Sequence, residues 1–335
     1  MAGTKIPWCD TVWNPVRGVS KGCRHCYAER QAARSLPGLR SPTSGESFAV
    51  MTAIGPRWTG KVELIESKLK EPLRWKNPRR IFVNSMSDLF HESLPDQAID
   101  GVFAVMALCP QHTFIVLTKR AKRMYEYVSG VNGAKRFHDI NVAAQQICGS
   151  PHYGAVLPTQ CDGMVPGGWP LPNVVLVVSC EDQKTADERI PWLVKTPAAC
   201  RGVSLEPLLG PINLVQHLFV PKYPDARPEM QELYREQWKR NHSILDWVIV
   251  GGESGPGARP MDPDWARSIR DQCQVAGVAF FFKQHGEWIG ELGSGEWSRS
   301  SIPVQSLGDG RVVRRVGKKA AGRLLDGREW NEFPD

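Results

Sequence analysis

The chain has 335 residues, 41% of them hydrophobic and 23% charged, which is ordinary for a globular protein of one large domain or two small ones. Its net charge of +7 permits a polyanionic partner without requiring one. No apolar stretch approaches the roughly 18 residues that span a bilayer, and the first residues show no signal-peptide pattern. We therefore expect a cytoplasmic protein without membrane contact, whose nine cysteines stay reduced.

The first predicted element is a short strand beside a cysteine-rich segment, Cys9–Arg30, with the sequence CDTVWNPVRGVSKGCRHCYAER. Three thiolates at one point, from Cys9, Cys23 and Cys26, can hold three irons of a [4Fe–4S] cluster. The fourth iron then stays open for a substrate or cofactor. A structural zinc site that also uses His25 is the alternative.

Six apolar runs follow, with helix-like segments between most of them. The predicted strands are Arg80–Phe90, His112–Arg120, Asn173–Asp182, Ala199–Leu209, Leu245–Ser254 and Val278–Gln284. The predicted helices are Pro95–Leu108, Ala121–Val128, Gln183–Lys195 and Asp264–Ala276. Continuous apolar strands that alternate with helices indicate an α/β fold with a parallel sheet, either covered on both faces or closed into a barrel. No glycine-rich dinucleotide loop follows the first strand, which argues against a Rossmann fold.

Two stretches interrupt this pattern, at about 130–172 and 217–243, and we interpret them as insertions that carry a lid or a partner surface. After Gln284 the sequence becomes turn-rich and then basic. We therefore predict a barrel over residues 1–290 and a basic C-terminal extension over 291–335 that packs on it. The basic run is a candidate nucleic-acid contact.

Nearly every predicted strand ends in a polar side chain, and the carboxyl ends of the strands form the active-site face of (β/α) barrels. These side chains include Asp88, Lys119, Arg120, Glu181, Glu206, Glu253 and Lys283. A metal-dependent nuclease or hydrolase that uses the four carboxylates of this rim is one hypothesis. It leaves the three cysteines without a role.

An open cluster iron at the mouth of a barrel suggests chemistry with S-adenosylmethionine (SAM), in which the cofactor carries the difficult step and the protein orients it. Reductive cleavage of SAM yields a 5′-deoxyadenosyl radical. Candidate SAM contacts are Tyr27 for adenine, Lys119 or Arg120 for the carboxylate, Ser179, Glu181 or Glu206 for the ribose or ammonium, and Gly251, Gly252 and Glu253 for close backbone approach. Candidate catalytic residues at strand ends are Cys180, Glu206 and Lys283.

The blocks WCDTVWNPVRGVSKGCRHCYAER, NSMSDLFHE, SLEPLLGPI and WVIVGGESGPGARPM resemble a phage-encoded three-Cys-motif family of radical-SAM-like proteins. The resemblance covers most of the chain outside the two insertions. It implies a partial (β/α) barrel of the TIM type and radical-SAM kind, with about six or seven parallel strands, a [4Fe–4S] cluster and SAM. Family members often carry a cysteine shortly after the Asn-Pro pair. That cysteine is absent here, so Cys9 becomes the third ligand.

The Gly-Gly-Glu sequence lies on the sixth strand rather than after the second, so the resemblance assigns the ammonium of SAM to Asp88. It also implies an electron donor such as a flavodoxin or ferredoxin. The implied substrate is a nucleic acid or nucleotide, for example a hypermodified thymidine of phage DNA. A zinc-containing protein that binds nucleic acid through its basic tail, without redox chemistry, is the second hypothesis.

Overall fold

The computed structural model describes residues 4–19, 24–34, 40–130, 133–149, 169–218, 244–290, 302–307 and 310–334. Cys23 and parts of both predicted insertions lie outside these ranges. The chain divides into two compact units. The first comprises Met1–Val178 and Lys195–Cys200, and the second comprises Ser179–Val194 and Arg201–Asp335.

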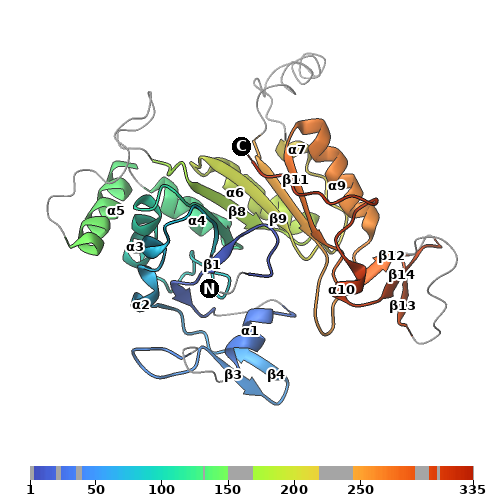
Figure 1. The fold of residues 1–335 in the computed structure, drawn as a ribbon, viewed down its shortest axis with the longest axis horizontal. Coiled ribbons are helices and arrows are strands. Elements are labelled where there is room, and N and C mark those ends of the chain that lie inside the picture. Colours follow the sequence, from blue (N-terminus) through green and yellow to red (C-terminus); the bar gives the residue numbers. More distant parts are fainter. Residues whose placement is uncertain are drawn as a thin grey trace, which may run out of the picture. The chain divides into compact units, whose positions relative to one another are not determined.

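The core of the first unit is a parallel sheet whose strand order follows the chain: β1 (Thr11–Trp13), β6 (Arg80–Val83), β7 (Thr113–Thr118) and β8 (Val174–Ser179). Every residue of β8 is buried, because the strand is apolar along its length and both of its faces are covered. Helices α3 (Asp96–Ala107) and α4 (Ala121–Ser129) follow β6 and β7, and α5 (Gly133–Cys148) packs on α3 (Figure 1).

A small substructure precedes β6 and was not predicted from the sequence. It contains α1 (Tyr27–Ala32) and the antiparallel hairpin of β3 (Ala49–Thr52) and β4 (Gly55–Trp58). It also contains the short pair β2 (Val16–Arg17) and β5 (Glu63–Leu64), and α2 (Glu66–Leu69) and the 3₁₀ turn Pro72–Arg74 follow it. Its own apolar cluster consists of Ala28, Ala32, Ala33, Phe48, Ala49, Trp58 and Ile65.

The second unit contains the parallel strands β9 (Cys200–Leu205), β10 (Trp247–Gly251) and β11 (Ala279–Gln284), again in chain order. Its helices are α6 (Gln183–Lys195), α7 (Val215–Leu218) and α9 (Pro263–Ala276). Local signals fix both ends of α9. The Asp262 carboxylate accepts a hydrogen bond from the Asp264 N–H at its start, and Gly277 ends it with a φ of 68°.

The C-terminal residues of the second unit form two structures. Strands β12 (Trp288–Gly290), β14 (Val312–Arg315) and β13 (Val304–Ser306) make an antiparallel sheet, and α10 (Lys318–Ala321) follows it. The last described residues then run antiparallel to β11, with Asn331 paired to Phe281. The Phe282 N–H donates to the Trp330 carbonyl (3.0 Å) and the Glu332 N–H donates to the Phe280 carbonyl (3.2 Å).

The parallel strands of the two units number seven among the described residues, and with their connecting helices they form a partial (β/α) barrel. This confirms the predicted fold class at that level. The six strands predicted from apolar runs and the four predicted helices are all present. Strands β6 to β10 end earlier than predicted, whereas β11 ends at Gln284 as predicted and includes Lys283. Within the described part of the chain, no helix is both long and apolar enough to cross a bilayer.

Candidate functional site

The N-terminal segment is bound to the loop that follows β6, at the carboxyl end of that strand. Asn84 follows β6 in the left-handed region, with a φ of 61°, and its Oδ1 accepts a hydrogen bond from the Val16 N–H (3.1 Å). The Asn14 Oδ1 accepts from the Ser85 hydroxyl and from the Met86 N–H, both at 3.1 Å. These contacts fix the segment that leads to the cysteine motif.

Cys26 and Tyr27 lie beside this loop. The Tyr27 hydroxyl donates to the Ser85 carbonyl at 2.6 Å, although 53% of the Tyr27 side chain is exposed. Cys26 is the N-cap of α1, where its Sγ accepts a hydrogen bond from the Glu29 N–H (3.4 Å). It packs with Met86 against the apolar cluster of the N-terminal substructure. The thiol of Cys26 is therefore at the edge of the sheet where (β/α) barrels carry their active sites.

Cys9 lies at the opposite end of the same strands. It comes just before β1, where the Asp10 N–H donates to the Arg80 carbonyl (2.9 Å) and the Asp10 Oδ2 accepts from the Arg80 N–H (2.7 Å). Arg80 is the first residue of β6, so the strand alone separates Cys9 from the Cys26 end by about 10 Å at about 3.3 Å per residue. The structure does not bring Cys9 to Cys26.

Cys9 is also buried, and its Sγ lies 3.9 Å from the Ile6 carbonyl as a hydrogen-bond donor. Cys23, the partner of Cys26 in the Cys-x-x-Cys pair, is outside the described residues. No group of three or more metal-ligating side chains occurs among the residues that are described.

Asp88 follows β6 and is fully engaged with the protein. One carboxylate oxygen accepts from the Thr118 hydroxyl (2.7 Å) and the Phe90 N–H (3.0 Å), and the other from the Lys119 N–H (3.2 Å) and Arg120 Nη1 (3.1 Å). A carboxylate has about four lone-pair sites, so Asp88 has little capacity left for the ammonium group of a ligand. Its structural effect is to join the loop after β6 to the end of β7.

Arg120 is the main cation of this edge. It pairs with Asp88 and places its Nε at 2.9 and 2.8 Å from the two carboxylate oxygens of Glu92. Burial opposes the charge of Arg120, but the two carboxylates outweigh it and raise the pKa of the guanidinium. Lys119, predicted as the alternative cation, contributes its backbone N–H to Asp88.

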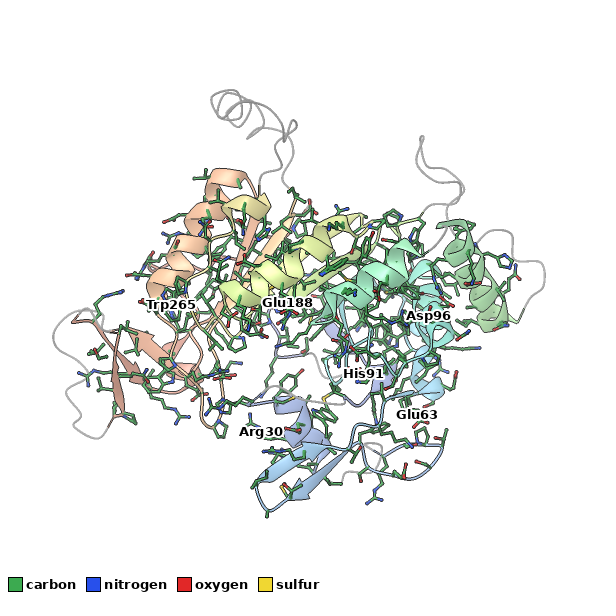
Figure 2. All side chains as sticks on the ribbon, turned by 180° about the vertical axis from the view of Figure 1, so that it is seen from behind. Arg30, Glu63, His91, Asp96, Glu188 and Trp265 are labelled. Atoms are coloured by element: carbon green, nitrogen blue, oxygen red, sulfur yellow. The ribbon has the colours of Figure 1, made fainter. Side chains whose placement is uncertain are left out.

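His91 is a buried neighbour that the sequence did not single out. Its Nδ1 accepts a hydrogen bond from the Ser93 N–H at 3.1 Å, which assigns the proton of the neutral ring to Nε2. Burial and the nearby charge of Arg120 lower the pKa of His91. Figure 2 labels His91 in the first unit. Its environment includes the charge of Arg120, which is distant in the sequence, so sequence spacing gives no signal for it.

In the second unit, an ion pair bridges across the middle one of the unit's three parallel strands. Glu206 follows β9, and its two oxygens lie 2.9 and 3.0 Å from the Nζ of Lys283 in β11. Strand β10 lies between β9 and β11, and its last residue is Gly251. A Cβ at Gly251 would lie 2.6 Å from Glu206 Oε1. The glycine therefore gives the ion pair its space.

The Gly251–Gly252 pair thus serves the protein's own packing. A Cβ at Gly252 would lie 2.0 Å from the His285 carbonyl oxygen, which is backbone and cannot move aside easily. Both glycines were predicted to allow close approach of a ligand to the backbone. The close approaches observed are those of Glu206 and His285.

The other predicted carboxylates of this unit are also paired. The Arg189 Nη1 donates to Glu181 Oε2 (3.1 Å) and to the Ser179 carbonyl (2.6 Å). Glu253 accepts hydrogen bonds from the backbone N–H, Nε and Nη2 of Arg259, all at 2.8 to 2.9 Å.

Cys180 is completely buried, and buried thiols of this kind are unreactive. A catalytic role for Cys180 requires that a substrate can reach it at the edge of the sheet. The structure does not place it there. Among the predicted catalytic residues, Glu206 and Lys283 are the two that the fold brings together.

Each of the four rim carboxylates therefore has its own cation. The pairs are Asp88 with Arg120, Glu181 with Arg189, Glu206 with Lys283, and Glu253 with Arg259. A carboxylate held by an arginine or lysine would have to exchange that partner for a metal ion. The arrangement disfavours the hypothesis of a nuclease that binds metal through these residues.

The fold and these edges define an α/β protein of the partial (β/α)-barrel class with polar side chains at the carboxyl ends of its strands. The chain belongs to the family described as a protein of unknown function, DUF5131, which it matches over residues 3–334. Comparison with curated proteins and with solved structures gave no match.

Proposed function

We propose that this protein is an iron–sulfur enzyme of the radical-SAM type that acts on a nucleic acid or nucleotide. The observation that carries the proposal is the position of Cys26, at the carboxyl end of β6 in a partial (β/α) barrel. The Cys23-x-x-Cys26 spacing and the family resemblance described above support the same chemistry.

The fit of the cluster to the cysteines is partial. The Cys26 thiol accepts a hydrogen bond from a backbone N–H and lies at the carboxyl end of β6. Cys9 lies at the other end of β1 and β6. We therefore propose Cys23 and Cys26 as ligands without Cys9. His25, between them in the sequence, is a candidate further ligand, because histidine replaces cysteine on some iron–sulfur clusters.

A bound cluster of this type supplies one electron for cleavage of SAM, so the proposal includes an external electron donor such as a flavodoxin or ferredoxin. Tyr27 presents an exposed ring that its hydroxyl holds in place, as an adenine contact requires. In the second unit, the ion pair with Lys283 holds Glu206 in a fixed orientation, and this pair is the candidate for holding or moving a proton.

The test compares Cys26→Ala with Cys9→Ala in protein purified and reconstituted without oxygen. Iron and sulfide are measured, followed by 5′-deoxyadenosine formed from SAM after reduction with dithionite. We expect about four irons per chain and deoxyadenosine formation in the wild type and in Cys9→Ala, and loss of both in Cys26→Ala. Circular dichroism of each variant verifies that it is folded.

Two outcomes would contradict the proposal. Zinc in place of iron in the wild type, with SAM unchanged, would favour the zinc-containing nucleic-acid-binding protein. Equal loss of iron in the two folded variants would return Cys9 to the ligand set and show that the amino end of β1 belongs to the site.

A further inference from the structure

The basic C-terminal segment, predicted as a nucleic-acid contact, uses much of its charge within the protein. Arg311 pairs with Asp262 at 3.0 Å and also with Asp264. Arg315 donates to the Gly255 carbonyl (3.2 Å), and the guanidinium of Arg328 lies 4.0 Å from the centre of the Trp330 ring. Arg311 and Arg315 thereby hold the C-terminal residues against the rest of the second unit.

The opposite situation holds in the substructure formed by residues 24–34 and 40–64, which we call the N-terminal lobe. The lobe contains six basic and three acidic residues, a net charge of +3 within 36 residues. How much of this positive charge is neutralised depends on the partners of the three acidic residues.

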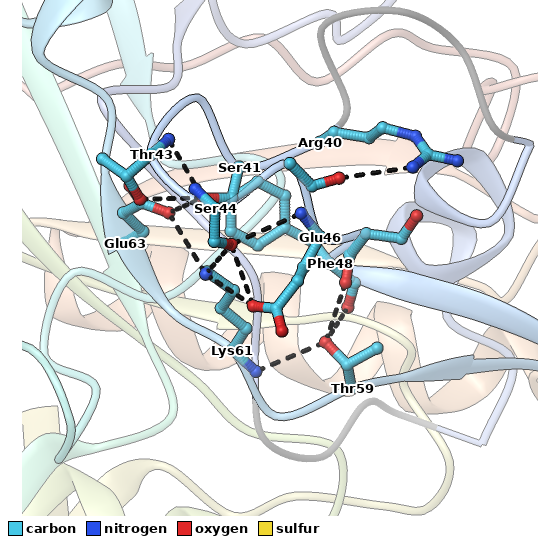
Figure 3. Close-up of polar contacts among 11 residues, drawn as sticks. Arg40, Ser41, Thr43, Ser44, Glu46, Phe48, Thr59, Lys61 and Glu63 are labelled. Carbon is cyan, nitrogen blue, oxygen red and sulfur yellow. Dashed lines mark hydrogen bonds and ion pairs between the residues drawn. The ribbon is translucent and has the colours of Figure 1, made fainter.

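All three acidic residues of the lobe are occupied by internal partners. The Glu29 Oε1 accepts from the Trp58 N–H at 2.8 Å. Glu46 pairs with Lys61 at 2.9 Å, and the hydrogen bond from Lys61 lowers the pKa of the Glu46 carboxyl. Glu63 accepts the hydroxyls of Ser41 and Thr43, both at 2.6 Å (Figure 3).

The arginines of the lobe are much less engaged. The Arg57 Nη1 donates to the carbonyl of the adjacent Pro56 (2.6 Å) and lies 3.9 Å from Glu29, and Arg40 donates one hydrogen bond to the Gly45 carbonyl (3.3 Å). The side chains of Arg24, Arg30 and Arg34 make no ion pair or hydrogen bond with any other residue that the structure describes. Lys61 is the one cation of the lobe that the acidic residues neutralise closely.

Helix α1 has one buried face and one exposed face. Ala28, Glu29, Ala32 and Ala33 are buried against the lobe's cluster. Tyr27 and Arg30 are three residues apart on α1 and share its outer face, and the exposed Arg34 follows in the turn after the helix. Figure 2 shows Arg30 on this helix. The face combines positive charge with an exposed aromatic ring that its hydroxyl anchors to Ser85.

The β3–β4 hairpin adds exposed apolar side chains to the same lobe. Val50, Met51 and Ile54 are 43%, 65% and 77% exposed, and Ile54 is in the turn between the strands. The hairpin is anchored at its base, where Ala49 and Trp58 are buried. Side chains such as Met and Ile insert between or against bases in several nucleic-acid complexes.

We propose that the N-terminal lobe binds a nucleic-acid strand, with Arg24, Arg30 and Arg34 on its phosphates and Met51 and Ile54 against an unpaired base. Arginine is the preferred partner of phosphate, and apolar side chains such as Met and Ile contact bases in nucleic-acid complexes. The inference deepens the proposed function, on which its link to catalysis rests, by naming a polymeric nucleic acid as the substrate class.

The experiment measures fluorescence anisotropy of a labelled 20-nucleotide single strand, and of the matching duplex, across a salt series. The test variant is Arg24→Ala/Arg30→Ala/Arg34→Ala. The matched control, Lys76→Ala/Lys184→Ala/Lys319→Ala, removes three exposed positive charges outside the lobe. All six positions are on the surface or partly exposed, and thermal melting verifies the fold.

We expect the arginine variant to bind the single strand at least about tenfold more weakly at 0.1 M salt, and the salt slope to fall by about 2. The lysine control should stay within about threefold of the wild type. Met51→Ser/Ile54→Ser should weaken binding of the single strand more than binding of the duplex, because the hairpin contacts unpaired bases.

Equal weakening by the two triple variants would overturn the proposal, since it would show only the effect of net charge. Unchanged binding in the arginine variant would overturn it as well. Binding to vesicles of anionic lipid that exceeds binding to the oligonucleotides would assign the lobe to a membrane surface instead. The measurements repeated on Cys26→Ala separate the two proposals, because binding that persists without a cluster supports the lobe whatever the outcome for the radical chemistry.

Discussion

At the scale of single residues, the second unit shows how a missing side chain can position two others. Glu206 and Lys283 are 77 residues apart in the sequence, and they meet because Gly251 leaves space above β10. All three residues are predicted as candidates from their places at strand ends. The role of the glycine in the ion pair is not predictable from the sequence, because it depends on which strands are neighbours in the sheet.

Alanine substitutions at three glycines test this interpretation. Gly251→Ala should lower the free energy of unfolding by about 1–3 kcal/mol, since the new Cβ displaces a side chain that can shift. Gly252→Ala should cost more, because the obstacle is the His285 carbonyl. Gly210→Ala is the control, since nothing lies within 4 Å of its Cβ position. Urea unfolding gives the three values, and equal midpoints would show that the close contacts are not limiting.

Cys9 shows a second limit of residue-level prediction. The sequence places Cys9, Cys23 and Cys26 within 18 residues, which is compatible with one cluster. The register of β1 against β6 decides otherwise, because Thr11 pairs with Ile81 while the Tyr27 hydroxyl contacts Ser85. A few residues of extended chain carry Cys9 away from Cys26, and spacing alone does not reveal which way the chain runs.

At the scale of elements, the apolar runs predicted the central strands well, because strands buried on both faces are apolar along their whole length. The β3–β4 hairpin was missed. It contains Pro56 and exposes most of its apolar side chains, so it shows neither a continuous apolar run nor a clean alternation. The residues that cover β11 were missed for a different reason. They pair with β11 because it is an edge strand of the parallel sheet, and their own sequence does not show this.

This C-terminal cover leads to a prediction at the same scale. Trp330 is 9% exposed, its Nε1 donates to the Leu325 carbonyl (3.3 Å), and its ring lies 5.7 Å from that of Phe280. Trp330→Ala should lower the free energy of unfolding by about 3–5 kcal/mol. It should also loosen the cover over β11 and promote association through the exposed strand edge.

The matched control for Trp330→Ala is Leu324→Ala, which also removes a large apolar side chain but at a position that is 55% exposed. Its effect should stay within about 0.5 kcal/mol. Unfolding midpoints and static light scattering report the two properties. A Trp330→Ala protein that is as stable as the control and stays monomeric would show that the C-terminal residues are not needed to protect β11.

At the scale of the whole molecule, charge is distributed in a way that composition did not reveal. The sequence suggested the basic tail as the surface for a polyanion, because its basic residues are consecutive. The structure shows many of them paired, and it leaves the least compensated arginines in the N-terminal lobe. A count of charges cannot distinguish these cases, because partners such as Asp262 and Arg311 are distant in sequence.

Burial and ion pairing should also determine how the folded chain titrates. Burial lowers the pKa of His91, His112, His217 and His285. Arginine partners also lower the pKa of Glu92, Asp96 and Asp326, against the effect of burial. In both groups the unfolded chain binds more protons than the folded chain as the pH falls, so acid should destabilise the fold.

The two groups act in different pH windows. The histidine contribution is complete above the unfolded value, near 6.5, and is lost as the pH falls towards the lowered pKa values of the fold. The carboxylate contribution is complete above about 4 and is lost below it. Burial raises the pKa of Asp100, so that residue acts in the opposite direction in the acidic range.

Urea unfolding at pH 7.5, 6.5, 5.5 and 4.5 tests the histidine window. The free energy of unfolding should fall between pH 6.5 and 5.5, with a slope of at most about 1.4 kcal/mol per pH unit for each contributing histidine. His91→Asn should flatten this slope, because an Asn oxygen can still accept the Ser93 N–H without titrating. His138→Asn, at an exposed position on α5, is the control and should leave the slope unchanged. A slope that His91→Asn and the control alter equally would show that the buried ring does not contribute to acid destabilisation.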